Sequence, residues 1–331
     1  PTQSVPETNS DINITANSAL SEYIATKMLT SATVIDISMF TESQNKSIVV
    51  DAVMEAKYQN PLVMGIKEMG YDEGNRILYI TYDGSVEETQ AKRQEVLAKA
   101  KEVVGQIITT GMSDLEKEFA INEYLCNLAQ YDNAALENAE ANDFKQVDDE
   151  YEDSFTPYGV IVKGLGVCAS YAGAFKVLAD EAGLDSIVVT GYLNGNLPHA
   201  WNRVNIEGEW LTVDVTNNDN DVIQNALLNV SDQGISGVLT EDDEFVISDK
   251  VSTYTCSSDK DEYYHYQSKY FEKEQITEKL IQELQENGQT VLRTDYTIND
   301  EDFYAIAQAV AQSLQMNIQG YYWLGVINLS K

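Results

Sequence analysis

The sequence predicts an α+β protein, with helices and antiparallel strands grouped in successive stretches of the chain. Strand-like segments at 200–205 and 209–215 are separated by Gly208, which favours an antiparallel pair. Ile35, Ile37 and Met39 alternate with polar residues, as in a half-buried strand. A long amphipathic helix is indicated by apolar residues that recur at helical spacing: Ala91, Val96, Leu97, Ala100, Val103, Val104, Ile107 and Ile108.

These elements are expected to divide the chain into four parts, since 331 residues fit two or three domains of ordinary size. The parts are a flexible tail (1–29), an α+β module with the long helix (30–109), a central domain (110–235), and a linker with a second α+β module (236–331). The strand, helix and strand expected at 291–297, 301–314 and 321–329 repeat the order of residues 30–85. We therefore hypothesise that two flanking modules of one type enclose the central domain.

The central domain is expected to begin with a helix whose start carries a capping box, Ser113 with Glu116. An acidic, irregular excursion follows at 133–157, within which residues 134–141 can form a helix. The chain then returns through a helix that starts at Cys168 and ends near Gly183, and a strand at 186–192 leads into the antiparallel pair.

The charge balance excludes several partner classes. The chain carries 21 basic and 54 acidic residues, a net charge of −33, so its surface repels nucleic acid and anionic lipid. No apolar run approaches the ~20 residues of a membrane span. The chain starts at Pro1 with a polar stretch, and its cysteines are scarce. We expect a secreted or cell-surface protein of Gram-positive type whose signal peptide has been removed.

The cysteine pattern favours neither a metal site nor a disulfide framework. Cys126 and Cys256 form one disulfide, or all three cysteines are reduced. The chain has no CxxC for zinc, and Asp219–Asn220–Asp221 lacks the spacing of a calcium loop. We therefore expect no metal and no cofactor.

Cys168 is the candidate nucleophile. It follows a turn that contains Gly164 and Gly166, and it opens a helix. A thiol at a helix N-terminus faces the positive end of the dipole and free backbone N–H groups, which favour the thiolate and can hold an oxyanion. A buried structural cysteine is the commoner fate of a single Cys, so Cys168 needs partners to support a catalytic role.

Those partners are His199 and Asp214. The chain has only two histidines, and His199 stands at the entry to the strand that pairs with the one carrying Asp214. The two side chains are therefore expected side by side at one end of the sheet. An imidazole there can take the thiol proton, while the carboxylate orients the ring and favours the imidazolium.

Three segments resemble the bacterial branch of the transglutaminase-like superfamily. They read GVCASYA at 166–172, HAWN at 199–202 and WLTVDVT at 210–216, and the resemblance extends over about 110–235. It implies a papain-like core in which the helix with the cysteine packs on the sheet with the histidine and aspartate. By the same resemblance, Cys168 is the nucleophile, His199 the general acid/base and Asp214 its orienting partner.

The remaining site residues are less sharply defined. The Cys168 backbone N–H and the Tyr158 side chain are the oxyanion candidates, and Trp201 is expected to form a cleft wall. Relatives often have Trp where this chain has Asn217. Asn217 is not expected to be catalytic, and the difference leaves the triad prediction intact.

Two functions remain open at this level. The first is an extracellular cysteine enzyme that attacks peptide or carboxamide bonds through a thioester, with protein or cell-wall peptide as substrate. It includes proteases, amidases and cross-linking acyltransferases. The alternative is a catalytically silent domain of the same fold that serves as a cell-surface binding or structural module.

Overall fold

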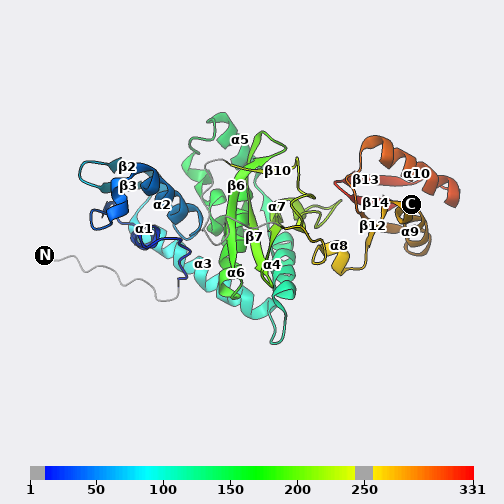
Figure 1. Ribbon diagram of the computed structural model, residues 1–331, viewed down its shortest axis with the longest axis horizontal. Helices are drawn as coiled ribbons and strands as arrows, with labels where there is room; N and C mark the ends of the chain where they lie inside the picture. The colour runs from blue at the N-terminus through cyan, green and yellow to red at the C-terminus, as the bar shows by residue number, and fades with distance from the viewer. Residues whose placement is uncertain (1–11, 243–255) are drawn as a thin grey trace.

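The computed structural model describes residues 12–242 and 256–331, which form three parts in a row (Figure 1). An N-terminal module (19–82) lies at one end, a central domain (86–241) in the middle and a C-terminal module (263–331) at the other end. Helices and antiparallel sheets occur in all three parts, which confirms the predicted α+β class.

The N-terminal module is a three-stranded antiparallel sheet with helices packed on one face. Its strand order is β1-β3-β2, and the inward residues Ile35, Leu78 and Ile80 are buried. The elements are α1 (Ala19–Leu29), β1 (Val34–Asp36), the 3-10 helix η1 (Thr41–Gln44), α2 (Lys46–Tyr58), β2 (Ile66–Asp72) and β3 (Ile77–Tyr82).

Residues 19–29 correct the predicted flexible tail, because they form α1. Ser18 caps this helix, and Leu20, Ile24 and Met28 are buried along one face. These apolar residues recur at four-residue spacing, a helical pattern that the polar stretch before them obscures. Residues 1–11 of the predicted tail lie outside the described residues.

The central domain is built on a five-stranded antiparallel sheet in the order β10-β6-β7-β8-β9. Its strands are β6 (Ser186–Leu193), β7 (Leu197–Ile206), β8 (Glu209–Val213), β9 (Leu228–Val230) and β10 (Leu239–Glu241), and a parallel pair is formed by β4 (Gln130–Tyr131) and β5 (Leu165–Gly166). Its helices are α3 (Val86–Ile107), α4 (Asp114–Leu128), α5 (Asn133–Ala141), η2 (Asp149–Phe155), the π-helical η3 (Gly159–Lys163), α6 (Cys168–Glu181) and α7 (Val215–Asn218).

Helix α6 is the central helix of this domain, because its residues 170–179 are all buried. Phe175 and Leu178 share one core cluster with Val204, Leu211 and Val213 of the sheet. The other face of the sheet buries a second cluster that includes Trp201 and Trp210. Burial on both sides holds the strand ends that carry His199 and Asp214 rigidly against the start of α6.

The C-terminal module has a four-stranded sheet in the order β11-β12-β14-β13. Its elements are α8 (Tyr263–Tyr266), β11 (Tyr270–Phe271), α9 (Lys273–Asn287), β12 (Gln289–Thr294), α10 (Asp300–Leu314), β13 (Gln319–Trp323) and β14 (Val326–Ser330). The single strand predicted at 321–329 is in fact the β13–β14 hairpin, because Leu324 turns the chain with a φ of 54°.

The two flanking modules share one topology, as hypothesised. Each runs helix–strand–helix–strand–strand, with a short η1 added in the first. In each, the third strand of this pattern lies between the first and the second: β1-β3-β2 in one module and β12-β14-β13 in the other. The C-terminal module adds β11, which pairs in parallel with β12.

Candidate active site

Cys168 stands at the first turn of α6, where a tight backbone arrangement holds it. Strand β4 pairs in parallel with β5, so that Tyr131 lies opposite Gly166. A Cβ at Gly166 would come within 2.6 Å of the Ser170 side chain, so only glycine fits at this position. The Val167 N–H donates to the Ser154 carbonyl at 2.9 Å, which fixes the residue before the half-buried thiol.

His199 and Asp214 meet at the same end of the sheet. β7 pairs with β8 in the antiparallel register predicted from the Gly208 turn. The His199 Nε2 lies 2.8 Å from the Asp214 Oδ2, and both side chains are buried. Asp214 directly follows β8 and also caps α7, because its carboxylate accepts from the Asn217 backbone N–H.

The electrostatics of this pair favour a charged imidazole. Burial lowers the pKa of His199 by opposing the charged ring. The charge and hydrogen bond of Asp214, followed by those of Cys168, outweigh this effect and raise the pKa to about 10. Since Nε2 is engaged by Asp214, the ring nitrogen left for Cys168 is Nδ1. The structure therefore places Cys168 and Asp214 next to the His199 imidazole, at the positions that the predicted triad requires.

Trp201 supports His199 from the core. The two ring centroids lie 6.0 Å apart and the planes differ by 21°. Trp201 is 1% exposed. It therefore packs behind the imidazole, and the prediction that it forms a cleft wall is wrong. Its position two residues beyond His199 on β7 places it in the cluster on the far side of the sheet.

Tyr158 is directed elsewhere. Its hydroxyl donates to Glu95 of α3 at 3.0 Å. The ammonium groups of Lys92 and Lys163 lie 5.6 and 5.7 Å from its ring centroid. These contacts engage its hydroxyl and ring in a surface cluster, so the placement gives no support to an oxyanion role for Tyr158.

Tyr131 is the aromatic residue that sequence reasoning missed. Its side chain lies within electrostatic reach of Cys168, and burial raises its pKa. Its ring stacks on Tyr171 of α6, with centroids 6.5 Å apart. The phenol is therefore a neutral O–H donor beside the backbone N–H where an oxyanion would form. Strand β4 has only two residues, too few to show a strand pattern in the sequence.

The other two cysteines are separate from this site. The structure has free thiols at all three positions, which decides between the two alternatives left open by the sequence. Cys126 faces the Val215 carbonyl, and Cys256 faces the Ser258 carbonyl. Burial raises the pKa of Cys126 to about 12 and that of Cys256 to about 11, so neither is a ready nucleophile.

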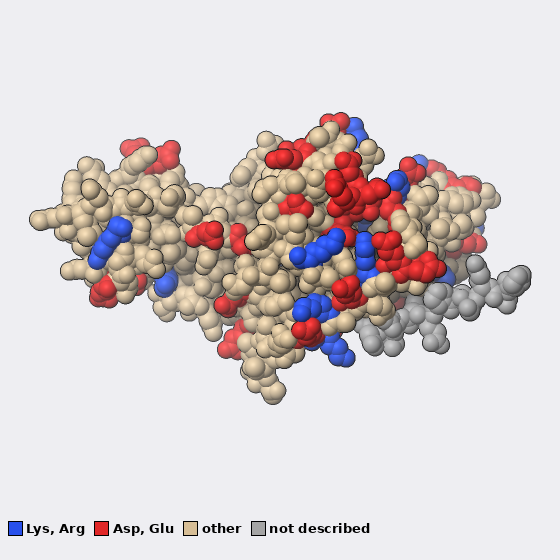
Figure 2. All heavy atoms as spheres, turned by 180° about the vertical axis from the view of Figure 1, so that it is seen from behind, with Lys and Arg blue, Asp and Glu red and all other residues tan. Residues whose placement is uncertain are grey.

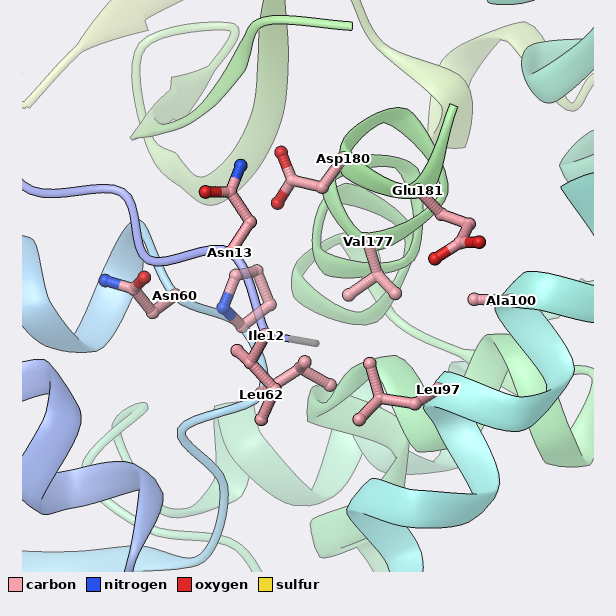
Figure 3. Close-up of a pocket in the computed structure, with 10 residues that line it drawn as sticks. Ile12, Asn13, Asn60, Leu62, Leu97, Ala100, Val177, Asp180 and Glu181 are labelled. Carbon is pink, nitrogen blue, oxygen red and sulfur yellow. The ribbon is translucent and has the colours of Figure 1, made fainter. Parts of the chain in front are cut away.

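A cavity of about 60 Å³ lies at the opposite end of α6, against the N-terminal module. Figure 3 shows Asp180 and Glu181 of α6 facing Asn13 and Asn60 across it, with Leu62 and Leu97 below. It has room for one or two waters. Since Cys168 begins the helix and this cavity lies at its end, the cavity is not part of the triad site.

The surface agrees with the charge balance. Figure 2 shows Asp and Glu side chains gathered where the central domain meets the N-terminal module, with a few Lys and Arg among them. Over residues 12–242 and 256–331, no helix is long and apolar enough to cross a membrane. Over the same residues, no group of three or more His, Cys, Asp or Glu is arranged to hold a metal ion.

The geometry of the site agrees with a family comparison. Residues 101–215 match the family model described as the transglutaminase-like superfamily. The chain carries a transglutaminase-like domain. The match covers about a third of the 331 residues and includes Cys168, His199 and Asp214.

The chain is similar to two curated relatives and to a solved structure. It is 29% identical over 143 residues to the kyphoscoliosis peptidase of Mus musculus, covering 39% of this chain and 20% of the relative. The Homo sapiens protein of the same name is 30% identical over 135 residues, covering 37% and 19%. A solved structure described as a TGase matches with a TM-score of 0.33 and 19% identity, over 52% of this chain and 49% of that one. The chain thus spans about a fifth of the length of these curated relatives.

Proposed function

We propose that the chain is a cysteine enzyme that cleaves or transfers acyl groups at peptide or carboxamide bonds. The observation that carries this proposal is the His199–Asp214 contact at 2.8 Å, with Cys168 on the other side of the imidazole at the start of a helix. The peptidase names of the two curated relatives support the same chemistry.

In the first half of the reaction, the Cys168 sulfur attacks the substrate carbonyl carbon and forms a C–S bond. The oxygen of the tetrahedral intermediate takes up negative charge, and the Cys168 backbone N–H and the Tyr131 hydroxyl are the donors beside it. The His199 imidazolium then gives its proton to the departing amine nitrogen as the C–N bond breaks. The product is a thioester on Cys168.

In the second half, neutral His199 takes a proton from the acceptor. If the acceptor is water, its oxygen displaces the sulfur and a carboxylic acid leaves. If it is an amine, a new amide forms and the acyl group has been transferred. Asp214 keeps the imidazole oriented through both halves, because its Oδ2 accepts from Nε2 throughout.

The proposed setting is the cell exterior, with protein or cell-wall peptide as substrate. The strong negative charge of the chain supports solubility and disfavours nucleic acid and anionic lipid as partners. The choice between water and amine as acceptor also belongs to this proposal, since the same three residues serve both.

The test is acylation by p-nitrophenyl acetate, an activated ester that needs no specific binding site. We expect a burst of nitrophenolate and one acetyl group on Cys168, located by peptide mass spectrometry. Cys168→Ala should abolish the burst while keeping the unfolding midpoint, and Cys126→Ala should keep the burst.

Adding lysine amide distinguishes water from an amine as the acceptor, because it accelerates deacylation only if an amine is accepted. A folded wild-type protein with no acetylation at Cys168 would favour the catalytically silent module instead.

A further inference from the structure

The Asp214 carboxylate accepts hydrogen bonds from Asn217 as well as from the His199 imidazole. Its Oδ2 accepts from His199 Nε2 at 2.8 Å and from the Asn217 side-chain amide Nδ2 at 2.6 Å. Its Oδ1 accepts from the Asn217 backbone N–H at 3.3 Å. Asp214 is 0% exposed, so these protein donors take the place of bulk water at the carboxylate.

Two of the donors converge on one oxygen. The Asn217 Nδ2 and the His199 Nε2 lie 3.4 Å apart. Both nitrogens donate to Oδ2, so they are close because they share this acceptor and not because they bond to each other. A neutral amide stabilises the carboxylate whether or not the imidazole is charged. Its contribution matters more when the imidazole is neutral, because the carboxylate then has no cation beside it.

We propose that Asn217 is a positioning residue of this site, which shares Oδ2 with His199 and so limits how tightly Asp214 holds the imidazolium. The inference rests on the proposed function, since it concerns the proton that His199 must release to the departing amine. A carboxylate with a second donor is a weaker base, and the imidazolium beside it is a better acid. Asn217 also keeps Oδ2 turned toward β7, because its backbone and side chain hold both carboxylate oxygens.

The groups that act on this pair come from four elements of the described chain. Cys168 on α6 and Asp214 after β8 act on His199 directly. Cys126 on α4 and Tyr131 on β4 lie within electrostatic reach of Asp214. Burial raises the pKa of Cys126 to about 12 and also raises that of Tyr131, so both stay neutral at neutral pH. A change at Asn217 therefore acts on the triad and not on a neighbouring charge.

The experiment is a pH titration of ¹⁵N-histidine-labelled protein by NMR. The chain has only His199 and His265, and His265→Gln assigns the two signals. The key variant, Asn217→Leu, keeps the branching at Cγ and the backbone N–H but removes the amide donor. We expect the His199 imidazolium in this variant to persist to a pH about one unit higher than in the wild type.

Asn196→Leu, at the exposed turn before β7, is the matched control and should titrate like the wild type. Asn217→Ala is a second variant that tests the same direction if Leu does not fit. An unchanged or lowered His199 titration in a folded Asn217 variant overturns this inference and leaves the proposed function standing. If wild-type His199 itself titrates like an ordinary histidine, the triad is not assembled, and the proposed function fails as well.

Discussion

At the scale of single residues, the decisive feature is a buried imidazole held between a sulfur and a carboxylate. The pKa of His199 is raised from 6.5 to about 10. A group whose pKa is raised on folding contributes stability that is fully present below its unfolded value and is lost as the pH rises through its folded value. The charged pair therefore stabilises the fold below about pH 6.5 and weakens toward pH 10, so the imidazole is still charged at neutral pH.

Tyr131 provides the sharpest test at this scale. Tyr131→Phe keeps the ring that stacks on Tyr171 but removes the hydroxyl beside the Cys168 N–H. We expect the rate of acyl transfer to fall about 10²-fold to 10³-fold, because one oxyanion donor is lost. Alkylation of Cys168 by iodoacetamide, which forms no oxyanion, should keep its rate. Tyr158→Phe is the matched control, and a larger loss there than at Tyr131 would reverse the assignment.

The residues of the candidate site were predictable from sequence to different degrees. Cys168, His199 and Asp214 follow from a glycine turn before a helix and from two strands joined at Gly208, which are local patterns. Tyr131 was not predictable, because its contact depends on a parallel pairing with a segment 35 residues away. The role of Asn217 was also missed, since it depends on which way a side-chain amide turns on α7.

At the scale of elements, the turn before α6 positions Cys168. Gly166 has no room for a side chain: an added Cβ would meet Ser170 at 2.6 Å and Val160 at 3.0 Å. Ser170 in turn binds the Val160 N–H and the Thr156 carbonyl. The small residues around Cys168 thus allow α6 to pack closely against the segment that leads into it.

Gly166→Ala should therefore damage both the fold and the site. We expect a loss of about 1–3 kcal/mol in the free energy of unfolding, because the new methyl group overpacks a filled position. Displacement of Cys168 should also slow its acylation. Gly105→Ala, in the last turn of α3 where a Cβ meets nothing within 4 Å, is the control and should be neutral or stabilising. Equal stability of the two variants in urea denaturation would show that the turn is more adaptable than the structure implies.

Helices and strands were predictable from the sequence where a long apolar period or a clear turn residue marks them. The helices at 86–107 and 168–181 and the β7–β8 pair carry apolar periods or turn residues that specify them. Strand β10 was missed because it has three residues and pairs with β6, about 46 positions earlier in the chain. The β13–β14 hairpin was merged into one strand, since its turn uses Leu324 and not a pair of typical turn residues.

At the scale of the whole molecule, the buried Arg293 side chain ties the C-terminal module to the central domain. The Arg293 Nη1 on β12 lies 2.9 Å from Glu262 Oε1 and donates at 2.9 Å to the carbonyl of Ala226. Both charged side chains are buried. Burial raises the pKa of Glu262 to about 7 despite the opposing effect of Arg293. The hydrogen bond from Arg293 to Ala226 holds the module against the central domain, and Leu324 of the module packs into the sheet cluster that includes Trp201.

Arg293→Met should loosen that attachment. It leaves Glu262 buried without its cation, and we expect a loss of about 3–5 kcal/mol. Limited proteolysis between the central domain and α9 should become faster. The double variant Arg293→Met, Glu262→Gln should recover part of the lost stability, because it no longer buries an unpaired carboxylate. Lys145→Met, which breaks an exposed ion pair with Asp143, should change little. Proteolysis that does not respond to Arg293→Met would mean that apolar contacts alone hold the module.

The pairing of Cys168 with His199 is tested most directly by the rate at which iodoacetamide alkylates Cys168 from pH 4 to 9. Peptide mass spectrometry separates Cys168 from Cys126 and Cys256. Because the His199 imidazolium persists to about pH 10, we expect fast labelling at pH 5–6 that collapses in His199→Ala. Slow labelling of Cys168 that rises only near the ~8.5 of a free thiol, and that is unchanged in His199→Ala, would contradict the account.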